Sequence, residues 1–163
     1  SLGREVANWM PGRFSIRFFL AAGAYCFCFW VGDLLRITGN RKTEQKYLRN
    51  VTLLYEGQKI KTRGLIDTGN HLTAPASGIP VHVATAELMK RLCPVVKGVM
   101  YVPYRCVGSS GILPAVRIDE MKVEGEKDSF VIPKPWIAIT KGSLSPCDEY
   151  EVLIQKNDEG MQV

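Results

Sequence analysis

One short segment of the chain, GLIDTGN at residues 64–70, has the residue types and the order that acid–base chemistry needs. Two apolar residues before Asp67 predict the end of a strand, which would hold the Asp67 carboxylate in a rigid, half-buried position. The Thr68 hydroxyl can hydrogen-bond across to a neighbouring loop, and Gly69, which lacks Cβ, lets another backbone approach closely. A carboxylate held in this way can take a proton from a water molecule.

An apolar strand that ends in Asp-Thr-Gly is typical of aspartic proteases, in which two carboxylates share one proton. The chain contains this triplet once, and the 113 residues after position 50 are too few for two lobes with a carboxylate loop each. The partner of Asp67 is therefore expected to be Asp67 of a second copy, on a two-fold axis. Thr68, Gly69 and Asn70 are the predicted supports of the loop. The alternative is a polar turn without catalytic function, because Asp, Gly and Asn favour turns.

Such a site also needs a lid that excludes water. Residues 101–107 predict a strand, Gly108-Ser109-Ser110-Gly111 a flexible tip, and residues 112–113 a returning strand. We interpret this hairpin as a candidate flap. An ordinary surface hairpin is an equally good interpretation, since Gly-rich tips serve both.

The elements that must position these residues are mainly β, because short apolar runs alternate with Gly and Pro after residue 50. A hairpin is predicted from strands 51–55 and 59–66. One helix is predicted at residues 85–92, begun by a Thr cap and ended before Pro94. Further strands are expected at residues 80–83, 95–104, 112–118, 121–123, 130–132 and 136–140, within a domain over residues 51–156 that is followed by a polar tail, 157–163.

An apolar segment precedes this domain. Residues 18–32 carry no charge, and residues 14–35 are long enough for a transmembrane helix if Arg17 and Asp33 lie near the two interfaces. A buried core helix is the alternative. Residues 1–13 form an upstream flank and 36–50 a basic linker, whose positive charge favours a cytoplasmic protease domain at the cell membrane. Because the chain begins with Ser, we expect it to be a fragment of a longer protein.

Composition excludes several other classes of function. Residues 1–50 carry eight Lys or Arg and three Asp or Glu, whereas residues 51–163 carry thirteen of each, so the folded part lacks the basic stripe of a nucleic-acid-binding domain. The five cysteines form no C-x-x-C pair, and neither histidine is spaced with them as a metal ligand. We therefore expect no metal, no cofactor and no nucleic-acid partner.

Several blocks of the sequence carry a family resemblance. They are Leu65-Ile66-Asp67-Thr68-Gly69-Asn70-His71-Leu72, Pro75 with Ile79-Pro80-Val81, Val102-Pro103-Tyr104-Arg105-Cys106-Val107-Gly108, Gly111-Ile112-Leu113, Trp136-Ile137-Ala138-Ile139-Thr140 with Leu144-Ser145, and Tyr150-Glu151-Val152-Leu153. In this combination and order the blocks resemble the sporulation sigma-E factor processing peptidase family, also called stage II sporulation protein GA. The resemblance covers about two-thirds of the chain.

The resemblance implies a membrane-tethered aspartic endopeptidase that activates a sporulation sigma-factor precursor. It implies a retropepsin-like single-lobe barrel, a homodimer, and an activating signal protein from the adjacent compartment. Only Asp67 is carried over as catalytic. The chain departs from retroviral proteases at Ala138, where they use Gly. The alternative function is a non-catalytic, membrane-anchored binding or signalling module with the same β fold.

Overall fold

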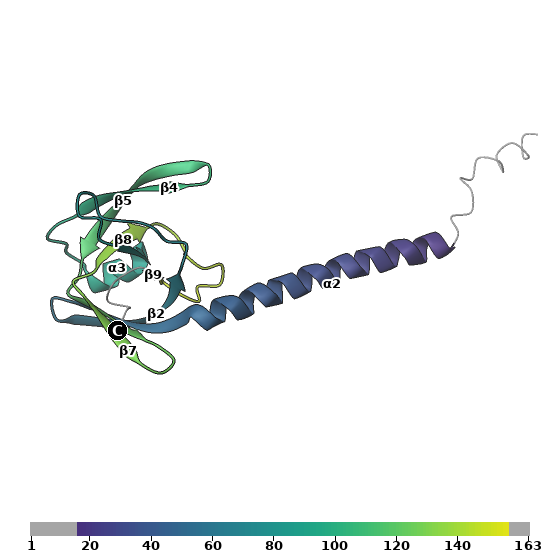
Figure 1. The fold of residues 1–163 in the computed structure, drawn as a ribbon, viewed down its shortest axis with the longest axis horizontal. Helices are drawn as coiled ribbons and strands as arrows, with labels where there is room; N and C mark the ends of the chain where they lie inside the picture. The colour runs from purple at the N-terminus through teal and green to yellow at the C-terminus, as the bar shows by residue number, and fades with distance from the viewer. Residues whose placement is uncertain (1–15, 157–163) are drawn as a thin grey trace, which may run out of the picture. The chain divides into compact units, whose positions relative to one another are not determined.

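The computed structural model describes residues 16–156 and divides the chain into two compact units, Ser1–Thr43 and Glu44–Val163, each taken here by itself. The predicted flank 1–13 and tail 157–163 lie outside the described residues. Figure 1 gives the labels of the helices and strands used below.

The apolar segment is helical, and its helix is longer than expected. Helix α2 runs over Ile16–Tyr47, so it includes residues 36–47 of the segment expected to be a linker, and strand β1 begins directly at Leu48. The residues in this extension are mostly Arg, Lys, Glu, Gln and Thr without Pro, and the long charged and amide side chains are good helix formers.

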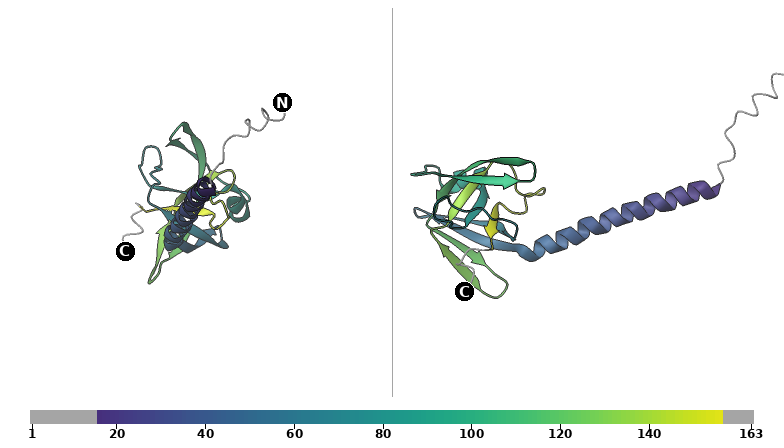
Figure 2. Two further views of the ribbon diagram at one scale, coloured as in Figure 1. Left: turned by 90° about the vertical axis from the view of Figure 1, so that its right-hand side faces the viewer. Right: turned by 45° about the horizontal axis from the view of Figure 1, so that its top comes forward.

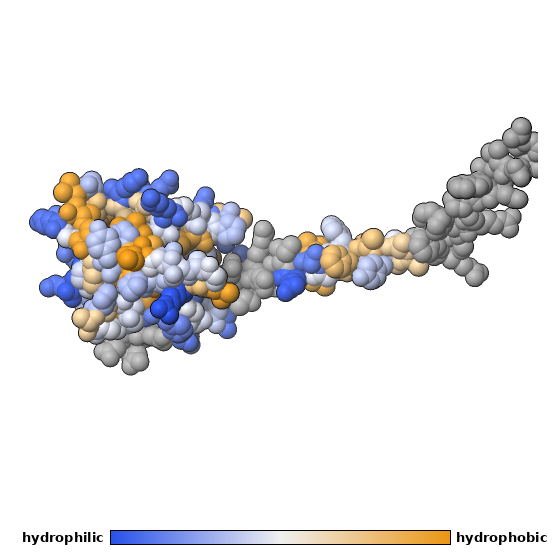
Figure 3. Space-filling view, turned by 90° about the horizontal axis from the view of Figure 1, so that it is seen from above, coloured by the Kyte–Doolittle hydropathy of each residue, from blue (hydrophilic) through white to orange (hydrophobic). Residues whose placement is uncertain are grey.

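Helix α2 exposes large apolar side chains between residues 20 and 35, and Figure 3 colours each residue of the helix by its hydropathy. These are Leu20, Tyr25, Phe27, Phe29, Trp30, Leu34 and Leu35. Over the residues that the structure describes, no helix meets the length and apolarity that crossing a membrane requires.

The second unit is mainly β, as predicted, and Figure 2 shows it from two further directions. It contains one described helix, α3, at Ala86–Leu92. Its strands are β1 Leu48–Tyr55, β2 Gln58–Asp67, β3 Val81–Thr85, β4 Met100–Cys106, β5 Ser109–Arg117, β6 Glu120–Glu124, β7 Ser129–Pro133, β8 Trp136–Thr140 and β9 Val152–Gln155.

All nine strands join in one sheet with the order β4-β5-β8-β3-β9-β2-β1-β6-β7. Most neighbours are antiparallel, including the predicted β1–β2 hairpin. Two pairs, β2 with β9 and β3 with β8, are parallel. Strand β3 lies between β8 and β9 and is buried at every position, from Val81 to Thr85. Any polar side chain on β3 therefore needs a hydrogen-bond partner inside the protein.

The core has two apolar clusters that pack on either side of this central region. The larger joins β1, β6, β9 and α3, and includes Leu53, Met121 and Ile154. The smaller includes Val81 and Val102. Both clusters contain residues of β3, so the central strand is held from two sides.

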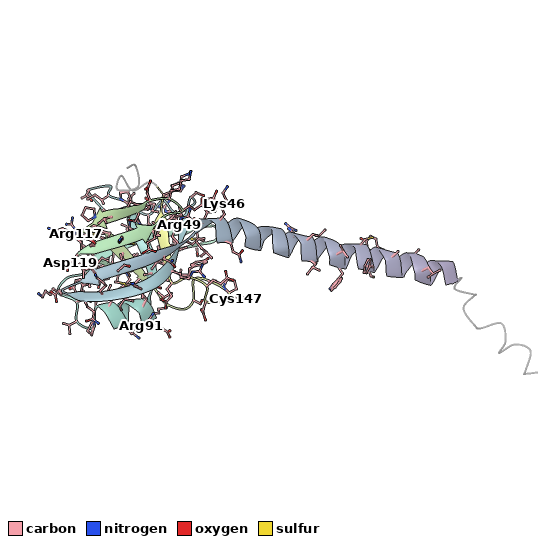
Figure 4. The ribbon with its side chains drawn as sticks, turned by 90° about the horizontal axis from the view of Figure 1, so that it is seen from below. Lys46, Arg49, Arg91, Arg117, Asp119 and Cys147 are labelled. Carbon is pink, nitrogen blue, oxygen red and sulfur yellow. The ribbon has the colours of Figure 1, made fainter. Side chains whose placement is uncertain are left out.

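Helix α3 forms as the sequence predicts. The Thr85 hydroxyl accepts a hydrogen bond from the Leu88 N–H at 3.3 Å, which caps the first turn. On the outer side of the helix, Arg91 (Figure 4) pairs with Glu151 at 2.6 Å, and the other carboxylate oxygen of Glu151 accepts from the Thr62 hydroxyl at 2.6 Å. Glu151 thus links α3 to β2 immediately before β9 begins.

Two strand predictions differ from the structure. The strand expected at 95–104 begins only at Met100, because Pro94 and Gly98 interrupt the run before it. Strand β9 is not among the predicted strands, since four residues are too short for a periodic pattern. This omission matters, because β9 lies beside the Asp67 strand.

Candidate active site

Asp67 is the last residue of β2 and is half-buried, as the apolar strand before it predicts. One of its carboxylate oxygens, Oδ1, accepts a hydrogen bond from the Gly69 N–H at 2.9 Å. This bond closes a short turn in which Thr68 and Gly69 are exposed. The Asp67 carboxylate is therefore held by its own loop at an accessible edge.

Gly69 lies close to the Asp67 carboxylate. A Cβ atom at position 69 would stand 3.3 Å from Asp67 Oδ1, which is tighter than an ordinary contact. A side chain at Gly69 would therefore push the carboxylate away from its present position. The loop therefore favours a residue without Cβ at position 69 because of the Asp67 carboxylate, and the approach of a second backbone stays a prediction.

Asn70 turns into the protein and is only 8% exposed. Its amide nitrogen donates to the Val81 carbonyl at 3.2 Å, and its Oδ1 accepts from the Leu72 N–H at 2.9 Å. Leu72 and Val81 are themselves joined by a backbone hydrogen bond of 2.9 Å. Asn70 thus fastens the Asp67 loop to the start of β3.

Two further polar residues lie under this loop and were missed by the sequence analysis. Gln155, at the end of β9, is 2% exposed, and His82, on β3, is fully buried. The Gln155 side chain donates to Asn70 Oδ1 at 3.3 Å, and its backbone N–H donates to His82 Nδ1 at 3.0 Å. The sequence signal for Gln155 was weak, because it consisted only of a single Gln after the apolar run Val152–Ile154. His71, the other histidine, is exposed on the same loop.

The candidate flap is a hairpin of β4 and β5, paired from Met100 with Ala115 to Cys106 with Ser109. Its turn is narrower than expected, because Ser109, Ser110 and Gly111 belong to β5 and only residues 107–108 lie between the strands. Gly108 adopts a positive φ of 83°, which favours glycine. The hairpin and the Asp67 loop belong to different strands of the sheet. Strand β8 lies between β5 of the hairpin and β3.

Close packing inside the hairpin explains its second glycine. A Cβ atom at Gly111 would lie 2.8 Å from the Tyr104 ring, which is the cross-strand neighbour of Gly111. Tyr101, Val107 and Ile112 expose large apolar side chains on the same hairpin. The hairpin therefore combines a glycine turn with an apolar surface.

The chemistry available at this site comes from carboxylate and amide groups. Within residues 16–156, no three side chains of His, Cys, Asp or Glu are grouped as they would be around a metal ion. The five cysteines are free thiols, and Cys93 alone is buried among them. The arrangement holds the Asp67 carboxylate at the end of β2, and the buried side chains of Asn70 and Gln155 support its loop.

Comparison with known proteins adds independent information. The family model described as Sporulation factor SpoIIGA matches residues 4–157. Two curated relatives match as well. The sporulation sigma-E factor-processing peptidase of Priestia megaterium is 26% identical over 132 residues, which cover 66% of this chain and 42% of that protein. The probable sporulation sigma-E factor-processing peptidase of Clostridium acetobutylicum is 24% identical over 154 residues, 91% of this chain and 56% of that protein.

The chain therefore spans about half the length of the curated relatives it matches. No solved structure matches it. Because the family model covers nearly the whole chain, including the Asp67 loop, the hairpin and β9, the chain belongs to the sporulation factor SpoIIGA family.

Proposed function

We propose that this chain is the protease region of a membrane-tethered aspartic endopeptidase that activates a sporulation sigma-factor precursor. The observation that carries the proposal is the placement of Asp67, a half-buried carboxylate at the end of β2 on a loop that Asn70 fastens to the buried strand β3. A carboxylate held in this way keeps its position when a substrate binds, which general acid–base catalysis requires.

In the proposed mechanism two copies of the chain each supply one Asp67. Two carboxylates that face each other closely cannot both be ionised at low cost, so they share one proton and titrate as a pair. The ionised member takes a proton from water as the water oxygen adds to the carbonyl carbon of the scissile peptide, while the protonated member donates to the carbonyl oxygen. The C–N bond of this tetrahedral intermediate then breaks, and the leaving nitrogen takes a proton from the pair. Thr68 is exposed beside Asp67, so its hydroxyl is accessible to the loop of the second copy.

The substrate follows from the relatives. Both are named for the processing of a sporulation sigma-E factor, which supports a sigma-factor precursor as the protein substrate here. The β4–β5 hairpin is the proposed flap, because its glycine turn and exposed apolar residues suit a lid that closes over a peptide.

The proposed location is the cell membrane, with the protease region in the cytoplasm. The apolar side chains of α2 support a tether, and the excess of basic residues after the apolar segment supports a cytoplasmic protease region. An activating signal protein from the adjacent compartment completes the proposed set of partners.

Co-expression tests the proposal. The full-length protein, its activating partner and the sigma-factor precursor are expressed together, and the size of the precursor is compared between the wild type and the Asp67→Ala and Asp67→Asn variants. Asp128→Asn is the matched control, because at Asp128 the backbone carbonyl makes the hydrogen bond to Gly125 and the side chain is exposed. We expect cleavage to be lost in both Asp67 variants and kept in the control, at equal protein levels.

Cleavage that continues unchanged in Asp67→Asn would remove Asp67 from catalysis and support the alternative, a non-catalytic binding or signalling module. The pH profile gives a second comparison. A pair of carboxylates that shares a proton gives bell-shaped activity, with one limb for each ionisation of the pair.

A further inference from the structure

Strand β9 is a four-residue strand in an unusual position, between the strand that ends in Asp67 and the buried strand β3. It is parallel to β2, and in this pairing Gln155 is the partner of Asp67. It is antiparallel to β3, with Leu153 opposite Val83. The last residue of β9 therefore lies where the Asp67 loop leaves the sheet.

The Gln155 side chain makes hydrogen bonds in which it is always the donor. Its Nε2 lies 2.8 Å from the Leu72 carbonyl, 3.3 Å from Asn70 Oδ1 and 3.4 Å from the Val81 carbonyl. All three acceptors are oxygens, and two of them belong to the segment that follows Asp67. An amide nitrogen has two N–H groups to share among them, whereas a carboxylate has none.

The backbone of Gln155 is anchored too. Its N–H donates to His82 Nδ1 at 3.0 Å, and His82 is fully buried on β3. Because Nδ1 accepts this bond, the neutral ring carries its proton on Nε2. Main chain and side chain of Gln155 are thus both fastened to β3, and the side chain reaches from there to the Asp67 loop.

We infer that Gln155 is the positioning residue of the Asp67 loop: from β9 it holds Asn70 and Leu72, and through them the carboxylate at the edge of β2. The inference rests on the proposed function for its effect on catalysis. Asn70 accepts from both Gln155 and Leu72, so removing the Gln155 amide takes away one of the two donors to Asn70 Oδ1 and a donor to the Leu72 carbonyl. A catalytic group displaced by a fraction of an ångström loses rate while substrate binding is little affected.

Two substitutions at Gln155 separate positioning from packing. Gln155→Met keeps an unbranched side chain of similar length but removes both donors. In Gln155→Glu an ionised carboxylate would face three oxygens, whereas the protonated carboxyl group has one O–H that can donate to the Leu72 carbonyl. Relative to wild type, the Glu variant should therefore recover activity as the pH falls, and the Met variant should not.

Thr85→Val is the matched control. Thr85 is a buried residue of the same strand as His82, and its hydroxyl accepts one hydrogen bond, from the first turn of α3. The substitution keeps the branched shape and removes that bond at the opposite end of β3 from the Asp67 loop. This control therefore shows how far the loss of one buried hydrogen bond changes kcat only by lowering the stability of the protein.

The experiment measures kcat, KM and the urea midpoint for each variant in the full-length protein, with the precursor as substrate. It also measures hydrogen–deuterium exchange of the segment 67–72 in the 163-residue chain. For Gln155→Met we expect kcat to fall about ten-fold or more, KM to stay within about two-fold, and exchange to rise in 67–72. For Thr85→Val we expect kcat and the exchange of 67–72 to match the wild type.

The inference is overturned if Gln155→Met keeps the kcat of Thr85→Val, or if its exchange in 67–72 equals that of wild type. Failure of the proposed function would give a different result, because the Asp67→Asn variant would then still cleave the precursor. In that case the exchange measurement still decides whether Gln155 positions the loop, because it needs no enzymatic activity.

Discussion

Gly64 on β2 lies directly against Ile154 on β9, and a Cβ atom at Gly64 would stand 3.0 Å from Ile154 Cδ1. The same atom would stand 2.8 Å from Val51 Cγ2, on the other neighbour of β2. Both side chains are buried in the larger core cluster. The missing Cβ of Gly64 therefore lets three strands pack closely just before the chain reaches Asp67.

Gly64→Ala should lower the free energy of unfolding by about 1–3 kcal/mol, because a methyl group is forced into a packed core. This outweighs the stabilisation of about 0.4–1 kcal/mol that Gly→Ala brings through the unfolded chain. Urea unfolding measures the difference. The control is Gly98→Ala, since a Cβ at Gly98 meets open space. A Gly64→Ala variant as stable as this control would contradict the packing described.

Gly69→Ala should reduce the cleavage rate with little change in stability. The new Cβ would stand 3.3 Å from Asp67 Oδ1, so the carboxylate must shift by a few tenths of an ångström. We expect a loss of about ten-fold in kcat, while the exposed position keeps the unfolding free energy within about 0.5 kcal/mol of wild type. Cleavage assays and urea unfolding of the same preparations test this. Unchanged kcat would show that the loop accepts a side chain at position 69.

If the β4–β5 hairpin is the flap, bulky residues at Gly108 and Gly111 should impair cleavage and leave the proposed dimer intact. Gly108→Val places a branched residue at a φ of 83°, and Gly111→Val drives a side chain into the Tyr104 ring. Cleavage assays and analytical ultracentrifugation provide the two measurements.

The matched control for the flap is Gly57→Val, in the β1–β2 hairpin. Gly57 has a φ of 79° and open space around its Cβ position, as Gly108 does. The two substitutions therefore impose the same backbone strain on different hairpins. Equal activity in Gly108→Val and Gly57→Val would remove the flap assignment.

Stability should fall as the pH rises from 9 to 11, in part because of Cys93. Burial, together with the smaller effects of the nearby carboxylates of Glu56 and Asp119, raises the pKa of the Cys93 thiol from 9.0 to about 11. Between these two values the unfolded chain loses the thiol proton and the folded chain keeps it, so each rise in pH favours unfolding. Over the whole interval, this thiol should lower the free energy of unfolding by about 2–3 kcal/mol.

Urea unfolding at pH 8, 9, 10 and 11 measures this loss, and Cys93→Ala isolates it from lysine and tyrosine titration. The variant is less stable at pH 8, because it leaves a small cavity, but its stability should decline less steeply above pH 9. Parallel declines in the two proteins would mean that Cys93 titrates normally. The exposed thiols of Cys106 and Cys147 should react with a thiol reagent at pH 8 before Cys93 does.

The sequence by itself determined the elements that depend on neighbouring residues. Thr85 before an apolar run predicted helix α3 and its cap, and the neighbouring apolar runs at 51–55 and 59–66 predicted the β1–β2 hairpin. The apolar run before Asp67 placed its carboxylate at the end of a strand. These features are local, because caps, turns and alternation act over a few residues. The length of α2 was underestimated, since basic residues do not end a helix.

Only the tertiary structure decided what supports the Asp67 loop. Gln155 and Asn70 are separated by 85 positions, and Gln155 and His82 by 73, so no local pattern relates them. Their contact follows from the register of β9 between β2 and β3, and a shift of one residue would turn Gln155 to the other face of the sheet. Burial then determines the chemistry, since polar groups without access to water must bind one another. The sequence could therefore identify the carboxylate, and the fold alone could show which residues hold it.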